Sequence, residues 1–405
     1  MSASPPDYNT SQPRTLFTAG VLRGEPIDLD PSSIRPGNAS GLFLARLNRA
    51  ADATGEAITR RDGEEGVVAV KVVEDDRTRV PRDGKREATL LSKLDHPNIL
   101  ALLNAYLTPP SPSSLSSTVK IFTPFYPITL SSLLSSPAFT PSSSSPSSFL
   151  ALAHSLALQL LSAVAHMHEN GIAHRDINPN NVVLARSGRA VLIDFGIAIE
   201  GGDEKEGEMD FEVGTGPYRA PELVFASRSY HAPSLDLWAL ATTLSEFFTP
   251  LEAPAPPSPA SSDSGDGWGH YREEEEEEDK GLRRKTLFQG GASDFVLAGS
   301  IFKVLGTPTV ETWPEAAALP NFSRFTFSSF PPTPLLTHLA HLDSASPLAL
   351  ILPAMLVISA AGRMSARDAA DRLRRAEILV PESMGGERTS AGHSLEQLLA
   401  TMLPV

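Results

Sequence analysis

The chain has 405 residues and a formal net charge of −14, from 34 Lys and Arg against 48 Asp and Glu. It contains no cysteine, which excludes disulfide bonds, thiolate zinc sites and a cysteine nucleophile. The length allows two compact units with sizeable cores, and the 35 prolines and 28 glycines predict irregular segments between them. Because the acidic excess leaves no strongly basic face, we expect no nucleic-acid partner.

Residues 1–30 are polar and contain proline, which predicts a disordered N-terminal tail without the apolar core of a signal peptide. The most apolar stretch, Leu348–Ala361, contains Pro353 and is too short to cross a bilayer, which needs about 20 apolar residues. We therefore expect a protein of the cytoplasm, the nucleus or both, with no membrane partner.

Residues 31–126 form a first region, which we expect to fold as a small lobe dominated by a sheet. Runs of β-branched residues predict strands at Val67–Val73 and Val119–Thr123. The pattern between these strands, at Lys85–Leu94, predicts one helix. After this region the pattern of apolar residues changes from that of strands to that of helices.

Residues 127–385 form a second region, which we expect to be mainly helical. Apolar residues at helical spacing predict helices over residues 149–170, 234–248, 294–305, 348–358 and 365–375. A tract at about residues 250–285 is rich in Pro and Ser and then in Glu, which predicts a disordered acidic insert or, alternatively, an acidic docking segment. Residues 386–405 are assigned to a C-terminal extension.

Four separated motifs carry the candidate chemistry. In chain order they are Val68-Ala69-Val70-Lys71, His174-Arg175-Asp176 with Asn181 five residues after the aspartate, Asp194-Phe195-Gly196, and Ala220-Pro221-Glu222. A lysine at the end of a buried strand needs a partner, and Glu87 on the following helix could supply it. Alone, Lys71 and Glu87 would be an ordinary strand lysine and a solvated helix glutamate. The order and spacing of all four motifs favour a functional interpretation.

The polar residues of these motifs suit phosphoryl transfer. A carboxylate at Asp176 beside an acceptor hydroxyl can orient that hydroxyl and take its proton. The side-chain oxygens of Asn181 and Asp194 are hard ligands, which suit Mg²⁺ bound to the phosphates of ATP.

With these motifs the chain resembles the eukaryotic protein kinases over about Ile34 to Arg375. The resemblance implies an α+β, bilobal protein kinase fold, with a small β-rich N-lobe and a larger helical C-lobe that bind ATP and Mg²⁺ between them. It implies that Lys71 holds the α- and β-phosphates while paired with Glu87. It also implies that Asp176 is the catalytic base.

The remaining roles follow from the same resemblance. Asn181 and Asp194 are expected to bind Mg²⁺, and Thr215 matches the threonine of serine/threonine kinases. Asn178 stands where these kinases usually carry a lysine near the transferred phosphate, and an amide supplies no charge there. Four further residues are expected to be architectural, namely Asp236 and Trp238 on a central helix and the ion pair of Glu222 with Arg363.

The nucleotide site implied by the resemblance departs from the family at its phosphate loop, where Gly37-Asn38-Ala39-Ser40-Gly41 offers only two glycines. In the linker Thr123-Pro124-Phe125-Tyr126 we expect Thr123 at the gatekeeper position and an adenine-facing N–H from Tyr126. The residues expected to contact ATP are Gly37, Gly41, Ala69, Lys71, Thr123, Pro124, Tyr126 and Val183.

A closer resemblance is to the cyclin-dependent kinase group, through Asp95-His96-Pro97-Asn98-Ile99 and the segment Ile301–Pro308. Between Gly196 and Gly214 the activation segment has no Ser, Thr or Tyr to receive a phosphate. Asp210 falls where that group carries its activating phosphothreonine. We expect its carboxylate, or that of a neighbouring acid, to rest against Arg86 and Arg175, two of the three arginines that gather the phosphate in that group. The alternative is a solvated acidic loop without docking.

The position of the group's cyclin-binding helix is polar here, at Arg82-Asp83-Gly84-Lys85. These departures resemble the single-subunit CDK-activating kinases of fungi. That resemblance implies a monomeric serine/threonine kinase that phosphorylates the activation-segment threonine of a cyclin-dependent kinase, active without cyclin or activation-loop phosphorylation. The alternatives are another kinase of the same group with different substrates, and a pseudokinase scaffold, which Asn178 and the altered glycine loop favour.

Overall fold

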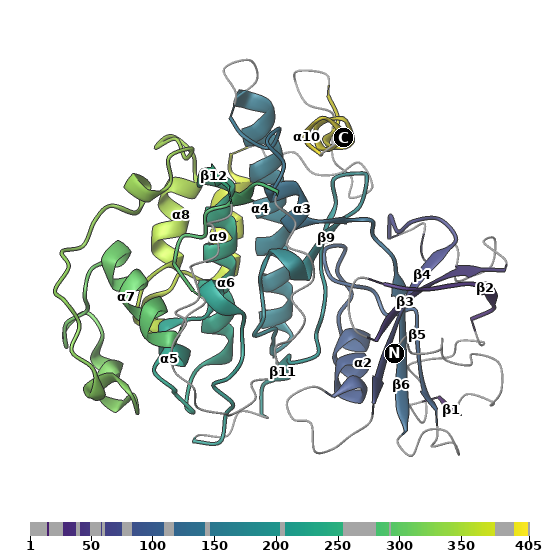
Figure 1. The fold of residues 1–405 in the computed structure, drawn as a ribbon, viewed down its shortest axis with the longest axis horizontal. Helices are drawn as coiled ribbons and strands as arrows, with labels where there is room; N and C mark the ends of the chain where they lie inside the picture. Colours follow the sequence, from purple (N-terminus) through teal and green to yellow (C-terminus); the bar gives the residue numbers. More distant parts are fainter. Residues whose placement is uncertain are drawn as a thin grey trace, which may run out of the picture.

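The computed structural model describes residues 14–15, 27–37, 41–48, 58, 61–74, 83–108, 117–141, 146–202, 207–253, 281–290, 293–376 and 393–403. These residues form a β-rich N-lobe and a larger, mainly helical C-lobe, which lie side by side in Figure 1. The α+β, bilobal fold expected from the sequence is confirmed.

The N-lobe is built on one six-stranded antiparallel sheet with the strand order β1-β5-β6-β4-β3-β2. Its strands are β1 Arg14–Thr15, β2 Leu29–Pro36, β3 Leu42–Leu47, β4 Val67–Glu74, β5 Asn104–Thr108 and β6 Thr118–Pro124. The β-branched runs form the two central strands, β4 and β6, where Val68, Val70 and Ile121 are buried. In this register Ala69 lies opposite Thr123.

One helix, α2 Gly84–Lys93, packs against this sheet. It begins one residue before the predicted start, because the Asp83 side chain caps it by accepting hydrogen bonds from the backbone N–H groups of Lys85 and Arg86. The helix buries Glu87 on its inner face.

The C-lobe is mainly helical. Its α-helices are α3 Leu130–Leu134, α4 Pro146–Glu169, α5 Pro221–Val224, α6 Ala232–Ser245, α7 Asp294–Leu305, α8 Leu348–Met355, α9 Ala366–Arg374 and α10 Leu395–Met402. Its 3-10 helices are η1 Pro179–Asn181, η2 Gly216–Tyr218, η3 Glu246–Phe248, η4 Pro314–Ala318, η5 Phe322–Arg324, η6 Leu335–His338 and η7 Ala360–Gly362. Its short strands are β7 Ile128–Thr129, β8 Ile172–Ala173, β9 Val182–Leu184, β10 Ala190–Leu192, β11 Ile199–Glu200, β12 Leu251–Glu252 and β13 Arg283–Arg284.

The long helix α4 runs through the centre of the C-lobe (Figure 1) and contacts α6, α9 and β10. Among the described helices, α4 alone is long and apolar enough to cross a membrane by length and composition, over Ser147–Glu169. Because 67% of its most apolar window is buried inside the fold, this composition is that of a core helix.

The predicted elements agree with the structure apart from their ends. The helix predicted at residues 294–305 is α7, with the same bounds, and Ser293 caps it. The helix predicted at residues 234–248 ends earlier as an α-helix, at Ser245, and continues as the 3-10 turn η3. α8 ends at Met355, two residues after Pro353.

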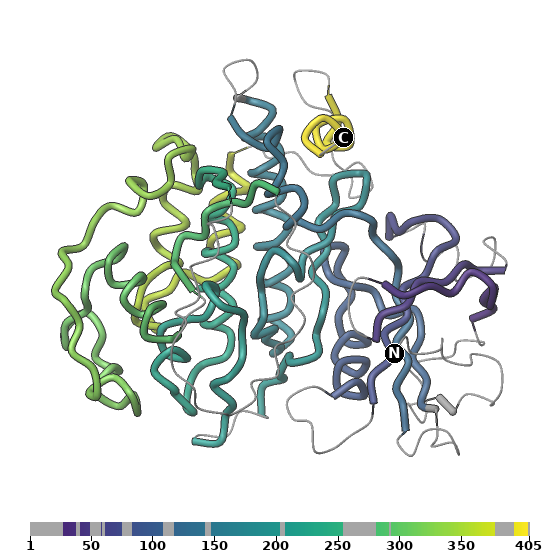
Figure 2. Tube along the Cα trace, viewed as in Figure 1, coloured from purple at the N-terminus to yellow at the C-terminus, as the bar shows by residue number. Residues whose placement is uncertain are grey.

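Three expectations need correction. The predicted disordered insert at about residues 250–285 is too wide, because its two ends pair as strands β12 and β13. Likewise, β1 and the start of β2 lie inside the predicted tail at residues 1–30, while residues 1–13, 16–26 and 254–280 lie outside the described residues. In the C-terminal extension, α10 was not predicted; it packs against α4 (yellow in Figure 2) and buries Leu395, Leu398, Leu399 and Met402.

Candidate active site

Three charged side chains meet between the lobes. The Lys71 ammonium on β4 donates hydrogen bonds to Glu87 Oε1 at 2.9 Å and to Asp194 Oδ1 at 2.6 Å. Glu87 lies on α2 in the N-lobe and is only 3% exposed. Asp194 lies in the C-lobe, just after β10. The structure therefore brings Lys71 together with its expected partner and with one expected Mg²⁺ ligand.

The charges in this cluster follow from burial and contact. Burial alone would lower the pKa of Lys71, but the carboxylates of Glu87 and Asp194 outweigh it, and the pKa of Lys71 is raised. Burial alone would raise the pKa of Asp194, but the Lys71 ammonium outweighs it, and the pKa of Asp194 is lowered. Lys71 is therefore cationic and Asp194 anionic at neutral pH, which suits contacts with phosphates and a divalent cation.

The loop that carries Asp176 is held by a buried carboxylate. Asp236 on α6 is 0% exposed and accepts hydrogen bonds from the backbone N–H groups of His174 at 2.8 Å and Arg175 at 2.7 Å. Its Oδ2 also lies 2.9 Å from His168 Nε2. Arg175 has φ +67°, a left-handed conformation that few residues other than glycine adopt. The contacts of Asp236 stabilise this strained turn.

Asp176 accepts hydrogen bonds from three side chains. Its donors are Thr215 Oγ1 at 2.6 Å, Asn178 Nδ2 at 3.1 Å and Asn181 Nδ2 at 3.0 Å. Asn181 Nδ2 also donates to the Asp176 carbonyl at 2.8 Å. Because its amide nitrogen is used in this way, the amide oxygen of Asn181 is the atom that could bind a metal ion.

Asn178, the residue that departs from the serine/threonine kinase pattern, is 3% exposed. Besides its bond to the Asp176 carboxylate, its Nδ2 lies 3.4 Å from Thr215 Oγ1, and its Oδ1 accepts from the backbone N–H of Asn180 at 3.0 Å. Asn178 therefore spans Asp176 and Thr215 as a neutral donor. It orients the carboxylate and adds no positive charge.

The residues expected to contact the adenine ring lie at the linker between the lobes. Thr123 and Ala69 are paired and buried at its N-lobe edge, and Val183 on β9 is buried on the C-lobe side. The Tyr126 phenol donates a hydrogen bond to the Arg61 carbonyl at 2.8 Å. The backbone N–H of Tyr126 has no protein acceptor among the described residues, so it is available to an acceptor nitrogen of the base.

The expected phosphate loop is the turn between β2 and β3. Gly37 N donates to the Leu42 carbonyl at 2.8 Å, and residues 38–40 lie outside the described part of the chain. Gly41 has φ +73°, and a Cβ there would lie 2.7 Å from the Val72 carbonyl oxygen. Glycine is therefore required at position 41. The roles of Gly37, Gly41 and the other expected ATP contacts stay predictions.

The expected contact of Asp210 with two arginines is not formed. The Asp210 carboxylate accepts a hydrogen bond from the backbone N–H of Glu212 at 2.9 Å. Among the described residues, no ion pair joins this carboxylate to Arg86 or Arg175. The predicted contact of the Asp210 carboxylate is therefore wrong, and the same role for a neighbouring acid stays a prediction.

The Tyr230 hydroxyl makes the contact with Arg175 that was expected of the Asp210 carboxylate. The Arg175 guanidinium donates to the Ile197 carbonyl at 2.8 Å and to the Tyr230 hydroxyl at 3.2 Å. The Tyr230 hydroxyl in turn donates to the Asp210 backbone carbonyl at 2.5 Å. Sequence reasoning missed Tyr230, because a single tyrosine ahead of α6 forms no motif. The hydroxyl bridges Arg175 and the activation segment without a phosphate.

Two more contacts hold the activation segment. Lys93 at the end of α2 forms an ion pair with Glu200, at 2.6 Å. The Tyr218 hydroxyl, close to Thr215, donates to Glu246 Oε1 at 2.6 Å. Burial raises the pKa of Glu246 to about 8, against the opposing effects of Tyr218 and Arg284. Glu200 is therefore an acid of this segment that contacts a cation outside the segment, Lys93 of α2.

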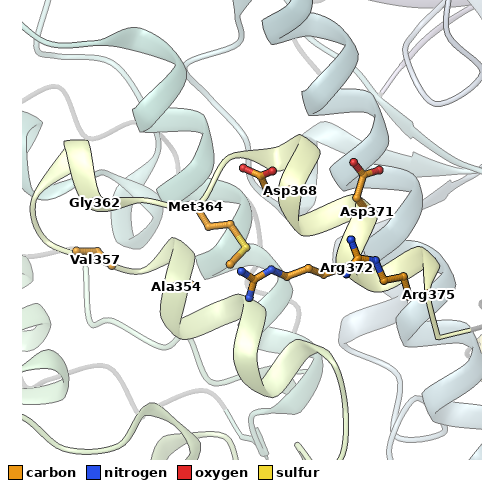
Figure 3. A pocket seen from close by; sticks show the side chains of 8 residues that line it. All are labelled: Ala354, Val357, Gly362, Met364, Asp368, Asp371, Arg372 and Arg375. Atoms are coloured by element: carbon orange, nitrogen blue, oxygen red, sulfur yellow. The ribbon is translucent and has the colours of Figure 1, made fainter.

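A hollow of about 530 Å³ lies away from these residues, between α8 and α9. Figure 3 shows Asp368, Asp371, Arg372 and Arg375 beside Met364 in its wall. Asp371 is paired with Arg374, and Asp368 accepts a hydrogen bond from Ser365. None of the motif residues lines this hollow, so it is not part of the candidate active site.

Comparison with known proteins agrees with this geometry. The protein kinase domain family matches residues 54–285, which is more than half of the chain. The chain belongs to the protein kinase family. It is 27% identical over 271 residues to serine/threonine-protein kinase csk1 of Schizosaccharomyces pombe, covering 66% of this chain and 73% of that protein. It is 28% identical over 290 residues to cyclin-dependent kinase 7 of Xenopus laevis, covering 72% and 67%.

A third relative is cyclin-dependent kinase 20 of Danio rerio, 31% identical over 213 residues, or 52% of this chain and 51% of that protein. These similarities confirm that this kinase is a protein serine/threonine kinase of the cyclin-dependent kinase type. Members of this family use ATP, generally with Mg²⁺. For this kinase, Asn181 and Asp194 are the residues that would hold the metal ion, which would neutralise charge on the phosphates.

Proposed function

We propose that this kinase phosphorylates the activation-segment threonine of a cyclin-dependent kinase, and that it does so as a monomer without cyclin or phosphorylation of its own activation segment. The observation that carries the proposal is the bridge from Arg175 through Tyr230 to the Asp210 carbonyl. In the resembling group a phosphate occupies the corresponding place. Here a neutral hydroxyl makes the contact within one chain.

The contacts around Lys71 support the same proposal. A kinase is competent when the strand lysine, the helix glutamate and the metal-binding aspartate are in place together. Here Lys71 contacts both Glu87 and Asp194 in a single chain with an unmodified activation segment. Lys93 and Glu200 add a contact from α2 to the start of that segment. No partner surface is needed to complete this set of contacts.

The chemistry follows from the neighbours of Asp176. The substrate hydroxyl oxygen forms a bond to the γ-phosphorus of ATP, the bond from that phosphorus to the bridging oxygen breaks, and ADP leaves. Asp176, oriented by Asn178 and Asn181, accepts the hydroxyl proton. In the structure Thr215 Oγ1 already donates to the Asp176 carboxylate, which marks where a hydroxyl donor can sit.

The test offers phosphatase-treated kinase an unphosphorylated cyclin-dependent kinase, and mass spectrometry maps the modified site. We expect phosphate on the activation-segment threonine, none on a substrate with alanine at that position, and none with Asp176→Asn enzyme. Loss of activity on phosphatase treatment, or a requirement for a cyclin-like protein, would contradict the proposal. Transfer to other proteins alone would favour a different kinase of the same group.

A second candidate is a pseudokinase scaffold, which the neutral Asn178 in place of lysine favours. Such a protein would bind partners without transferring phosphate. Radiolabelled ATP separates the two candidates: transfer by wild-type protein that disappears with Asp176→Asn contradicts the scaffold. Equal background with both proteins, while ATP still binds, would support it.

A further inference from the structure

The connection from β3 to β4 contacts the C-lobe outside the linker. We name residues 61–64 of this connection the interlobe strap. The Asp62 carboxylate accepts a hydrogen bond from Ser187 Oγ at 2.9 Å and lies 3.1 Å from Arg189 Nε. Both partners belong to the turn between β9 and β10, in the C-lobe. The chain just ahead of β4 and this turn can be followed in Figure 2.

This charge pair is largely removed from solvent. Arg189 is 2% exposed, and a buried guanidinium without an acidic neighbour would be strongly destabilising. Asp62 has φ +50°, a left-handed conformation in which aspartate and asparagine are tolerated better than most residues. The backbone of Asp62 is therefore in a strained conformation, in which its carboxylate lies next to Arg189.

The strap is also fixed to the N-lobe and the linker. The backbone N–H of Gly63 donates to the carbonyl of Ile58, which is 0% exposed in the N-lobe core. The backbone N–H of Glu64 donates to the Phe125 carbonyl at 2.8 Å. The Tyr126 phenol donates to the Arg61 carbonyl at 2.8 Å. Two of the linker residues are thus bound by the strap.

A third set of contacts reaches the end of α2, the helix that carries Glu87. The Arg61 guanidinium forms an ion pair with Asp95 and donates to the His96 carbonyl at 3.1 Å. Asp95 and His96 follow α2 directly, after Leu94. The strap therefore connects the end of α2 to the C-lobe turn through adjacent residues, Arg61 and Asp62.

The C-lobe side of this contact is held by hydrogen bonds and close packing. Gln159 of α4 donates to the Gly188 carbonyl at 3.0 Å and accepts from the Ala190 N–H at 2.8 Å. Leu395 of α10 covers Gly188 so closely that a Cβ on that glycine would lie 2.9 Å from the Leu395 Cβ. The turn that receives Asp62 is thus held by α4 from one side and covered by α10.

We propose that the interlobe strap fixes the angle between the two lobes, with Asp62 and Arg189 as positioning residues. Lobes joined by a short linker move by hinge rotation unless a second contact prevents it. The strap supplies such a contact in addition to the ion pair of Lys93 with Glu200, so Lys71 and Asp194 stay within hydrogen-bonding distance when no partner subunit is bound. The proposal rests on the proposed function in one respect: it takes the lobe arrangement in which Lys71 contacts Asp194 as the active state of the kinase.

The first experiment replaces Asp62 by asparagine, which tolerates the same backbone conformation and removes only the charge. If the lobes open, the fraction of closed enzyme falls, and the apparent affinity for ATP falls in proportion. We expect the KM for ATP, or the Kd where no transfer is measured, to rise about 3- to 10-fold, with kcat at saturating ATP changed less than about 2-fold. A loss of kcat at unchanged KM would indicate a merely structural role and overturn the proposal.

The matched control is Glu65→Gln, the same loss of charge at an acidic residue three positions farther along the connection. Glu65 is exposed and makes no contact with the C-lobe turn. It should leave both KM and kcat unchanged. If Asp62→Asn does not fold, Ser187→Ala removes one hydroxyl while leaving the charge pair in place, and it should raise the KM by a smaller factor in the same direction. If Asp62→Asn does not fold and the KM of Ser187→Ala for ATP is unchanged, the proposal is overturned.

A second experiment measures the lobes directly and does not depend on any substrate. Because the chain has no cysteine, Arg35→Cys in β2 and Val310→Cys, at a position 76% exposed in the C-lobe, allow two spin labels to be placed without other changes. We expect one narrow interlobe distance distribution in the parent and a broader one after Asp62→Asn. Identical distributions would overturn the strap proposal even if the enzyme phosphorylates a cyclin-dependent kinase. A broadened distribution in an inactive protein would support the strap and leave only the proposed function contradicted.

Discussion

The catalytic loop at residues 174–181 and the activation segment at residues 194–222 differ in where their contacts come from. In the loop, two of the three side chains that donate to the Asp176 carboxylate, Asn178 and Asn181, are only two and five residues away, while Thr215 and the anchor Asp236 come from farther along the chain. In the segment, the carbonyl of Asp210 is held by Tyr230 and the side chain of Glu200 by Lys93, from elements far along the chain. Short-range contacts can be recognised as motifs, whereas long-range contacts have to be seen in the fold.

The largest expected effect is that of Asp176→Asn in the catalytic loop. Asparagine can replace some of the hydrogen bonds of Asp176 but cannot take the substrate proton, so we expect kcat to fall about 10²- to 10⁴-fold with little change in ATP affinity. Steady-state kinetics with calorimetric ATP binding checks this. Asn180→Ala, an exposed neighbour on the same loop, is the control and should stay close to wild type.

A smaller effect is expected from Asp236→Asn, beneath the same loop. The Asp236 carboxylate accepts two backbone N–H bonds and contacts His168 while fully buried, so its loss should destabilise the fold by about 3 kcal/mol. Denaturant unfolding measures this change. Asp371→Asn, at a half-exposed residue of α9, should stay within about 0.5 kcal/mol of wild type. Similar values for the two variants would contradict the anchoring role of Asp236.

In the activation segment we expect Tyr230→Phe to lower kcat about 10- to 100-fold, because losing a hydrogen bond to a charged group costs about 1.5–3 kcal/mol. Asp210→Asn should change kcat less than about 2-fold, since the backbone carbonyl of Asp210, and not its carboxylate, contacts Tyr230. A larger loss of kcat in Asp210→Asn than in Tyr230→Phe would instead support the role of the Asp210 carboxylate that was predicted from the sequence.

The anchor of Tyr218 predicts a dependence of stability on pH. The folded protein holds the pKa of Glu246 at about 8, above the ordinary value of 4.5. Between these values the native state keeps a proton that the unfolded state has released, so the contribution of Glu246 to stability is fully present below pH 4.5 and falls by about 1.4 kcal/mol per pH unit up to pH 8. In Glu246→Gln this slope should disappear, while the amide oxygen still accepts from Tyr218. Thermal unfolding from pH 5 to 8 compares the two proteins, and equal slopes would exclude Glu246 as the titrating group.

The smallest effect is expected from deletion of Pro254–Glu278. The flanking strands β12 and β13 pair with each other and bring the two ends together, so a short turn can replace the deleted segment. We expect folding and basal kcat to be nearly unchanged. A large fall in Tm would show that the deleted residues contribute to the core.

The sequence predicted most of the elements because their signals are local. β4 and β6 are β-branched runs, α7 has a serine cap and an apolar face, and the lysine, aspartate and asparagine of the active site lie in fixed short motifs. α10 was missed: its capping serine and glutamine, Ser394 and Gln397, follow a segment without strong pattern, and only its packing on α4 shows that it belongs to the C-lobe. The paired ends of the acidic insert were missed for the same reason.

By itself the sequence determined the fold class, the protein kinase family and the identity of Lys71, Glu87, Asp176, Asn181 and Asp194 as one candidate site. The tertiary structure decided which groups hold that site in place. Tyr230 occupies the position expected for Asp210, and Asp62 of the interlobe strap reaches Arg189 in the other lobe. These hydroxyl and carboxylate groups meet their partners only after elements distant in the sequence have packed together. No local motif and no fixed spacing in the sequence therefore predicts these contacts.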